Sequence, residues 1–332
     1  MIIHLKKDTP AHIISEGITF YSGFCFEETS QIVMITSSTV KEPLDILKPF
    51  VLDTFVMNDD IQLASKTYIP QTREVKIGDI SIGGGSNNTV MISGPCSVES
   101  EEQLFSTAEF LYNKGVRILR GGCYKPRTSP YTFQGLGKKG LDLLVKAKEK
   151  FGMQIITEVK DHSHVQEVIE HTDWIQIGAK AMYDQGILNA CAKTTKPVLL
   201  KRGFGSTLQE FVQAAEFILS GGNPNVTLCE RGIRTFETKT RFTLDLCGVA
   251  YLKHHTNLPI ILDPSHALGY AYGVSDLARA CAAMGIDGLM IETHPNPKVA
   301  KSDASQQLNF EQFGALQDSL HPILNAVGKK LV

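Results

Sequence analysis

Eight short apolar runs, each ending in polar residues or glycine and followed by a segment with helical spacing, fill most of the chain after residue 88. The runs are TVMISGPCS, VRILRGG, QIITEV, WIQIGA, PVLLKRG, VTLCERG, PIILDPSH and GLMIETH. Continuous apolar runs of this length are typical of strands buried on both faces, as in parallel sheets. Eight β-then-α units in about 250 residues predict a (β/α)8 TIM barrel, in which parallel strands close inside a ring of helices.

The segments between the runs have the spacing of amphipathic helices. SEEQLFSTAEFLYNKG, LDLLVKAKEKFG and TLQEFVQAAEFILSGG are the clearest, and their final glycines predict helix C-caps. A doubly wound α/β sheet is the alternative, but it would need a glycine-rich dinucleotide turn that opens a helix. GGGSNN at residues 83–88 is followed by no helix. We therefore interpret EVKIGDISIGGGSNN as a hairpin that closes the bottom of the barrel.

The first 74 residues do not follow this rhythm. MIIHL, GITFYS and QIVMITS indicate strands, whereas PLDILKPF and a piece directly after MIIHL indicate helices. A small α+β sandwich, joined to the barrel through TYIPQTREV, accounts for this pattern. We expect two domains, residues 1–74 and residues 75–332.

Composition narrows the class of protein. With 332 residues, 42% of them apolar and 20% charged, the chain can bury a substantial core. A net charge of −2 argues against a general nucleic-acid binder. Seven cysteines, an odd number without close pairing, favour a reducing compartment. MIIHLKKDTP lacks a signal-peptide pattern and no apolar run approaches roughly 18 residues, so we expect a cytoplasmic protein without a membrane or nucleic-acid partner.

The carboxyl ends of the predicted strands carry many cations. In a barrel these ends form one rim, where the chemistry is placed. A single lysine there could equally be solvated surface charge, but so many cations at one mouth are tolerable only around a polyanionic ligand. Phosphate and carboxylate groups are the natural partners. The cations are Arg120, Lys125, Arg127, Lys180, Lys201, Arg231 and Arg234.

A second group at the same rim mixes a thiol, an imidazole and two carboxyl groups: Cys96, His266, Glu292 and Asp303. Cys96 alone would be read as a small buried hydrophobe, and His266 alone as an ordinary loop histidine. Together, at strand ends that are neighbours in a closed barrel, they predict a site for Mn²⁺, Fe²⁺, Zn²⁺ or Co²⁺. We expect Glu158 and Asp263 to orient neighbouring groups.

Several motifs together resemble one enzyme family. GPCSVES, LRGGCYKPRTSPYTFQGLG, IQIGA, KPVLLKRG, CERGIRTFE, ILDPSH, IETHP and SDASQQL are similar to 3-deoxy-D-arabino-heptulosonate 7-phosphate (DAHP) synthases. The match is to the type I β branch, which carries an N-terminal ferredoxin-like domain. The resemblance covers the chain from Val75 to its end; for the first residues it rests on MIIHLKK, LKPF and LASKTYIP.

The resemblance implies a metal-dependent condensation of phosphoenolpyruvate with erythrose 4-phosphate, the first step of the shikimate pathway. It assigns the phosphate and carboxylate of phosphoenolpyruvate to Arg120, Lys125, Lys180, Lys201 and Arg231. The aldose phosphate would go to Arg127, Thr128 and Ser129, and the metal to Cys96, His266, Glu292 and Asp303. Lys125 is also the expected proton donor. The family further implies a homotetramer, and an N-terminal regulatory domain that responds to tyrosine or phenylalanine.

The chain also departs from the family. Lys180 in GAKAMYDQ replaces the usual arginine, which predicts weaker phosphoenolpyruvate binding than in relatives. ALGYAYGV after DPSH replaces small and basic residues, and the N-terminal domain is shorter than usual. Three other functions stay open: a 3-deoxy-manno-octulosonate 8-phosphate synthase acting on arabinose 5-phosphate, a catalytically silent metabolite sensor, and a phosphate-binding barrel isomerase. A KANRS-type loop is typical of the first, whereas this chain has KPRTS.

Overall fold

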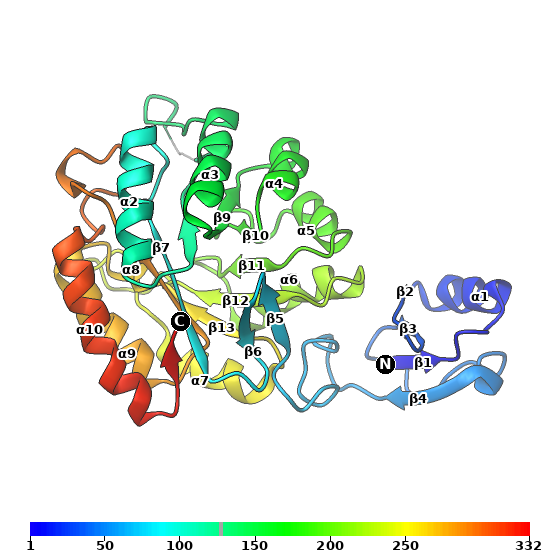
Figure 1. The fold of residues 1–332 in the computed structure, drawn as a ribbon. Helices are drawn as coiled ribbons and strands as arrows, with labels where there is room; N and C mark the ends of the chain where they lie inside the picture. The colour runs from blue at the N-terminus through cyan, green and yellow to red at the C-terminus, as the bar shows by residue number, and fades with distance from the viewer. Residues whose placement is uncertain (126–128) are drawn as a thin grey trace.

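The computed structural model of the chain describes residues 1–125 and 129–332. A closed parallel barrel with surrounding helices forms the larger part, and a small antiparallel sheet with one helix lies beside it (Figure 1). The predicted fold class, a TIM barrel with a small N-terminal α+β domain, is therefore confirmed.

The barrel is built from strands that each pair in parallel with the next, and the last pairs with the first, β14 with β7. They coincide with the eight apolar runs of the sequence. In chain order they are β7 (Asn88–Gly94), β8 (Ile118–Arg120), β9 (Gln154–Val159), β10 (Trp174–Ile177), β11 (Val198–Lys201), β12 (Val226–Glu230), β13 (Ile260–Leu262) and β14 (Gly288–Glu292). A short strand, β15 (Lys330–Leu331), pairs in parallel with the first two residues of β7.

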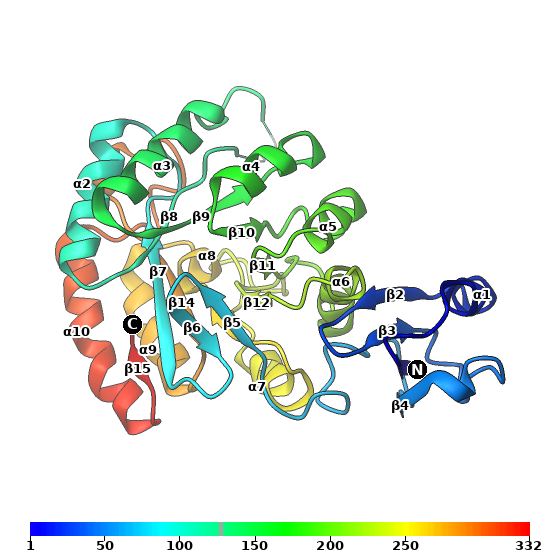
Figure 2. The ribbon, with the colours of Figure 1, turned by 45° about the vertical axis from the view of Figure 1, so that its right-hand side comes forward.

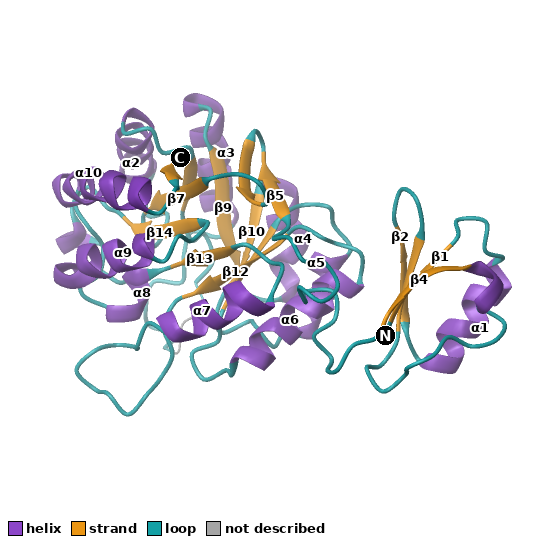
Figure 3. Cartoon of the chain, turned by 90° about the horizontal axis from the view of Figure 1, so that it is seen from below, coloured by secondary structure: helices purple, strands orange, loops and turns teal. Residues whose placement is uncertain are grey.

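Helices connect these strands and surround them, as Figure 3 shows. Side-chain caps define several of their starts; in α6 the N-cap Thr207 and Glu210 form a reciprocal capping box. The helix before β9 ends as predicted, at Gly152 in a left-handed conformation. The helices are α2 (Glu101–Asn113), α3 (Lys138–Phe151), α4 (Val165–His171), α5 (Gln185–Ala192), α6 (Leu208–Ser220), α7 (Leu246–His255), α8 (Pro264–Leu268), α9 (Val274–Ala283) and α10 (Phe310–Ala326).

A hairpin of β5 (Glu74–Ile77) and β6 (Ile80–Gly83) closes the barrel at the amino ends of its strands. Val75, Ile77 and Ile82 are fully buried in one cluster with the inward-facing residues of the barrel, among them Trp174 at the start of β10. Burying each aliphatic side chain is worth about 1.5–3 kcal/mol. The predicted bottom hairpin is confirmed, and it leaves the opposite end of the barrel for a site.

The N-terminal domain has the sheet order β2-β3-β1-β4, with every neighbouring pair antiparallel. This is the order of a ferredoxin-like β-α-β-β-α-β unit, except that its second helix is reduced to the 3₁₀ turn η1. The elements are β1 (Ile2–Leu5), α1 (Ala11–Tyr21), β2 (Phe24–Glu27), β3 (Ile32–Ile35), η1 (Lys48–Phe50) and β4 (Val51–Phe55).

Two expectations for this domain were wrong. GITFYS ends α1 and is not a strand, and PLDILKPF supplies only η1 instead of a full helix. The β-branched and aromatic residues of GITFYS favour a strand locally, but packing overrides such propensities. Ile13 and Gly17 form the buried face of α1, and a methyl group on Gly17 would lie 3.0 Å from the Cε atom of Met34. The helix therefore packs closely on the sheet.

The two parts of the chain meet at α6, which contacts strand β2 of the N-terminal sheet (Figure 2). The segment after β4 also reaches α6, since Glu216 on this helix accepts backbone hydrogen bonds from Gln62 and Ala64. None of the helices in the described part of the chain combines the length and apolar character that crossing a membrane requires.

Candidate active site

A thiol and two carboxyl groups converge at the carboxyl ends of two neighbouring strands. Cys96 follows β7, Glu292 ends β14, and Asp303 lies in the loop before α10. One potential ligand atom from each lies within 4.8 Å of the other two, and the Cys96 Sγ and Asp303 Oδ2 atoms are 3.5 Å apart. Asp303 has a φ of +45°, a conformation that costs a residue other than glycine about 1–3 kcal/mol. The surrounding loop holds this carboxyl group in place.

His266 lies beside this group of three, on the short helix α8. Its Nε2 atom is 3.4 Å from Glu292 Oε1. Its Nδ1 atom is 2.7 Å from Asp263 Oδ2, in a geometry that falls short of a hydrogen bond. The same carboxyl oxygen of Asp263 accepts a hydrogen bond of 2.5 Å from Lys201 Nζ. Asp263 thus contacts two site residues at once, in line with the orienting role expected for it.

Burial and charge set the protonation of these groups in opposite ways. Burial raises the pKa of the Cys96 thiol to about 11, and the nearby Glu292 carboxyl adds to the effect. Burial also acts to raise the pKa of Glu292, but His266 and Arg120 outweigh it and hold that pKa below its ordinary value. Burial likewise acts to raise the pKa of Asp263, but His266 and Lys201 outweigh this effect and hold that pKa well below its usual range. The carboxyl groups of Glu292 and Asp263 are therefore ionised, whereas the Cys96 thiol keeps its proton unless a cation displaces it.

Two of the predicted cations contact the donor group, the set of possible metal ligands formed by Cys96, His266, Glu292 and Asp303. Arg120, at the end of β8, donates from Nη1 to Glu292 Oε1 and to the Pro95 carbonyl, each at 2.8 Å. Its buried Nε has no hydrogen-bond partner among the described residues. Lys125 donates to Cys96 Sγ at 3.2 Å and is also buried. Both residues belong to the loop LRGGCYKPRTSP or to the strand before it.

A pocket of about 520 Å³ opens next to the donor group. Five of the predicted cations line it together with His266 and Asp303, so the structure brings the cationic group and the donor group to one cavity. Glu158 lines it too, held by a hydrogen bond of 3.3 Å from Gln176. The five cations are Lys125, Lys180, Lys201, Arg231 and Arg234; Arg241, Phe204 and Phe242 complete the lining on the arginine-rich side.

Aromatic rings support the arginines of this pocket. The guanidinium carbon of Arg231 lies 4.3 Å from the ring centre of Phe242, and that of Arg234 lies 4.6 Å from the ring centre of Phe204. The two rings stack on each other with centres 5.6 Å apart. Burial lowers the pKa of Arg231. Stacking on an aromatic face orients a guanidinium group without neutralising its charge.

Some predicted residues are not placed in the pocket. Arg127 and Thr128 lie outside the described residues. Ser129 is described, but its Oγ atom accepts from the Tyr131 amide at 3.3 Å, within its own loop. His294, which follows β14 in the sequence and to which no role was assigned above, is also buried outside the pocket lining, with Nε2 3.7 Å from Glu99 Oε2.

The sequence reasoning missed three polar residues of the site, Arg241, Gln306 and Gln307, and the buried Arg202 next to it. Arg202 is buried and donates to Glu230 Oε2 at 2.8 Å and to Asp245 Oδ2 at 2.9 Å. In the sequence, only its position directly after Lys201 marks Arg202. Adjacent residues of a strand point in opposite directions, so Arg202 does not enter the pocket with Lys201. Gln306 and Gln307 follow Asp303 in SDASQQL, where uncharged amides in a loop give no signal of a role in the site.

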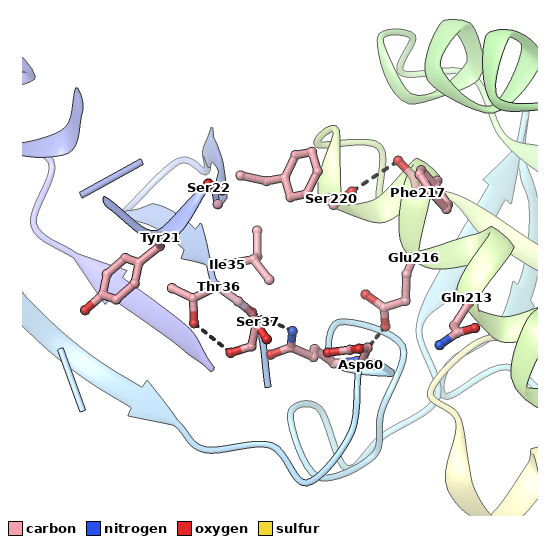
Figure 4. Close-up of a pocket in the computed structure, with 13 residues that line it drawn as sticks. Tyr21, Ser22, Ile35, Thr36, Ser37, Asp60, Gln213, Glu216, Phe217 and Ser220 are labelled. Carbon is pink, nitrogen blue, oxygen red and sulfur yellow. Dashed lines mark hydrogen bonds between the residues drawn. The ribbon is translucent and has the colours of Figure 1, made fainter. Parts of the chain in front are cut away.

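A second pocket, of about 480 Å³, lies between the N-terminal sheet and α6 (Figure 4). Tyr21, Phe24 and Phe217 give it aromatic walls, and its charged lining residues are acidic, Asp60 and Glu216. This composition differs from that of the cation-lined pocket, so the two cavities suit different ligands.

Comparison with known proteins now bears on these sites. The sequence profile described as the DAHP synthetase I family matches residues 60–326. A phospho-2-dehydro-3-deoxyheptonate aldolase of Thermotoga maritima is 44% identical over 292 residues, which are 88% of this chain and 82% of the relative. A 2-dehydro-3-deoxyphosphooctonate aldolase of Francisella tularensis subsp. holarctica is 31% identical over 247 residues, 69% of this chain and 88% of the relative.

Solved structures agree with these sequence matches. The crystal structure of the DAHP synthase from Thermotoga maritima superposes with a TM-score of 0.81 at 38% identity, covering 100% of this chain and 99% of that one. A truncated form of the Thermotoga enzyme gives a TM-score of 0.76 at 42% identity, covering 81% of this chain and 98% of that one. The family predicted from the motifs is confirmed: the chain belongs to the DAHP synthetase I family.

Proposed function

We propose that this chain condenses phosphoenolpyruvate with erythrose 4-phosphate and water to give DAHP and inorganic phosphate, the first step of the shikimate pathway. The observation that carries the proposal is the extent of the likeness to a DAHP synthase: it includes the N-terminal domain and reaches 44% identity. The octulosonate relatives match only 69–77% of the chain, at 29–32% identity.

We assign phosphoenolpyruvate to the cation-lined pocket. Lys180, Lys201 and Arg231 would hold its phosphate and carboxylate groups, with Arg120 and Lys125 beneath them. Two substrates that both carry phosphate repel each other, and fixed cations offset this repulsion so that the reacting carbons can approach.

The aldose phosphate is assigned to Arg127, Thr128 and Ser129. This assignment rests on the KPRTS motif alone, because the first two residues lie outside the described part of the chain.

The donor group fits a divalent transition ion. Cys96, Glu292 and Asp303 offer one sulfur and two oxygen atoms within 4.8 Å of one another, and His266 adds a nitrogen next to Glu292. This mixture of donors suits Mn²⁺, Fe²⁺, Zn²⁺ or Co²⁺ better than Ca²⁺ or Mg²⁺, which prefer oxygen ligands alone. When bound, such an ion would polarise the aldehyde oxygen as a Lewis acid.

The remaining work falls to the residues of the chain. C3 of phosphoenolpyruvate forms a bond to the aldehyde carbon, water adds at C2, and phosphate leaves. Lys125 is our candidate for the donor of a proton to the alkoxide oxygen, because its Nζ lies at the boundary between the donor group and the pocket. Arg231 and Lys201 would hold the phosphate group until it departs.

The test follows the loss of phosphoenolpyruvate absorbance with purified full-length protein and Mn²⁺. Erythrose 4-phosphate and arabinose 5-phosphate are offered separately, each with and without a chelator, and Cys96→Ala serves as the metal-site variant. Turnover with the four-carbon sugar that chelator and Cys96→Ala both abolish is the expected result. Turnover with the five-carbon sugar alone would make the chain an octulosonate synthase, and phosphoenolpyruvate binding without turnover would favour the silent sensor.

We further propose that residues 1–74 form a regulatory domain and residues 75–332 the catalytic barrel. An aromatic amino acid is the effector that the family implies, and the aromatic pocket of Figure 4, between the two parts, is our candidate for where an effector acts. A homotetramer is the proposed assembly. A cytoplasmic location is proposed because all seven cysteines are free thiols.

A further inference from the structure

One buried glutamine connects the two parts of the candidate site. Gln306 is 1% exposed and lies in the loop that carries Asp303. Its Nε2 atom donates to Glu292 Oε2 at 2.6 Å, and its Oε1 atom accepts from Arg241 Nη1 at 2.8 Å. Glu292 belongs to the donor group, whereas Arg241 lines the pocket and is 3.6 Å from Asp303 Oδ1. A single amide thus spans the distance between the donor group and the pocket.

The chemistry of the two partners requires an amide at this position. The ionised carboxyl group of Glu292 only accepts hydrogen bonds, and the guanidinium group of Arg241 only donates them. Glutamine is a side chain that donates at one end and accepts at the other, so both contacts fix its orientation. A leucine of similar size would leave a buried carboxyl oxygen without this donor, which costs free energy.

Glu292 depends on this contact because its other oxygen is already occupied. Oε1 accepts from Arg120 at 2.8 Å and lies 3.4 Å from His266 Nε2. Arg120 on Oε1 and Gln306 on Oε2 together fix the rotation of the carboxyl group about its last bond, and Gln306 supplies the hydrogen bond to Oε2. The adjacent Gln307 contacts a different member of the donor group: its Oε1 accepts from the Cys96 backbone amide at 3.0 Å.

We propose that Gln306 is a positioning residue that sets the metal affinity of the donor group and ties it to Arg241 in the pocket. The proposal rests on the proposed function, because it takes Glu292 as a metal ligand. Groups that orient a metal ligand typically change metal affinity 10–100-fold when they are removed. Gln306→Leu should therefore raise the Kd for Mn²⁺ by roughly 10–100-fold.

The experiment compares wild type, Gln306→Leu and Gln317→Leu as full-length, metal-free proteins. Gln317, on helix α10 and outside the site, is the matched control. Its side chain is also buried, and its amide donates to the Lys114 carbonyl at 2.8 Å. Calorimetric titration with Mn²⁺ gives the metal affinity, and a separate titration with phosphoenolpyruvate gives the anion affinity. Because several other cations line the pocket, we expect Gln306→Leu to keep its phosphoenolpyruvate Kd within about twofold.

The possible outcomes distinguish failure of the positioning role of Gln306 from failure of the proposed metal site. Wild type that binds no Mn²⁺ would overturn the proposed metal site, and this inference with it. Equal Mn²⁺ affinity in wild type and Gln306→Leu would overturn the positioning role alone. Loss of both affinities in Gln306→Leu would also overturn it, because it would mean general disruption of the site. Should Gln306→Leu fail to fold, Gln306→Asn answers the same question, since its shorter side chain keeps the amide but cannot span both partners.

Discussion

Replacing Glu216 by glutamine should remove a large pH-dependent term from the stability of the junction between the two domains. Glu216 lies on α6 and accepts backbone hydrogen bonds from Gln62, Leu63 and Ala64 at distances between 2.7 and 3.2 Å. These three residues belong to the segment that leads from the N-terminal sheet to the barrel. The docked segment therefore covers the carboxyl group and removes its hydration, which penalises the charged form.

The magnitude follows from the pKa. Burial raises the pKa of Glu216 from 4.5 to about 7, although the three backbone donors and Arg73 act in the opposite direction. A carboxyl group with a higher pKa in the folded state stabilises it fully below pH 4.5 and loses this contribution as the pH rises through 7. Between pH 5 and pH 8 the folded state should lose about 2–3 kcal/mol through this group.

The assay is urea unfolding at pH 5 and pH 8, followed by far-UV circular dichroism and by the fluorescence of Trp174. Circular dichroism reports both domains, whereas Trp174 is buried inside the barrel and reports that domain alone. The α-amino group of Met1 titrates in the opposite sense, because burial lowers its pKa from 8.0 to about 6. The difference between wild type and variant is therefore the quantity to compare.

Glu210→Gln is the matched control, on the same helix. Glu210 is exposed, and hydrogen bonds from Thr207 lower its pKa, so it titrates below the pH range of the assay. We expect the pH dependence to fall in Glu216→Gln and to stay unchanged in Glu210→Gln. An equal pH dependence in wild type and Glu216→Gln would refute the argument from burial.

Three further substitutions test individual contacts. Lys180→Arg should lower the apparent KM for phosphoenolpyruvate, because a guanidinium group can bind phosphate through two N–H groups; an unchanged KM in steady-state kinetics would contradict this. Arg202→Met should lower the free energy of unfolding, measured in urea, by about 3–5 kcal/mol, since Glu230 would stay buried without its charged partner. A decrease of less than about 1 kcal/mol would show that the Arg202–Glu230 ion pair is dispensable. Gly178→Ala should raise the KM for phosphoenolpyruvate at least roughly tenfold, because the added methyl group would collide with the Glu158 carboxyl group in the pocket; wild-type kinetics would mean that Glu158 can move aside.

The barrel was predictable from the sequence because its strands are buried on both faces. Such strands need continuous apolar runs, and these runs are visible without knowledge of their neighbours. The N-terminal domain was harder, because its elements are half exposed and the choice between helix and strand depends on packing. GITFYS has the composition of a strand, yet it ends a helix whose buried face is set by Ile13 and Gly17. No local pattern reports that contact.

The candidate site was predictable where charge marks it and hidden where charge does not. Lys180, Lys201 and Arg231 were found because cations at strand ends are conspicuous, and the pocket includes all three. Gln306 carries no charge, and its importance comes only from the two partners that the fold brings to its ends. Arg202 shows the converse: it is charged and lies next to Lys201, but it points to Glu230 and away from the pocket.

The cations of the site fall into two classes by their partners, and this division supports anion binding at the pocket. Arg120, next to the pocket, and Lys201, in its lining, form buried ion pairs with carboxyl groups, so much of their charge is already balanced within the protein. On the pocket wall, Arg231 and Arg234 stack on phenylalanine rings, which orient a guanidinium group but leave its charge in place. A buried arginine such as Arg231 loses hydration, and burial already lowers its pKa. An arriving phosphate group would give the buried Arg231 a charged partner, whereas Arg120 and Lys201, which are already paired with carboxyl groups, would have less to gain.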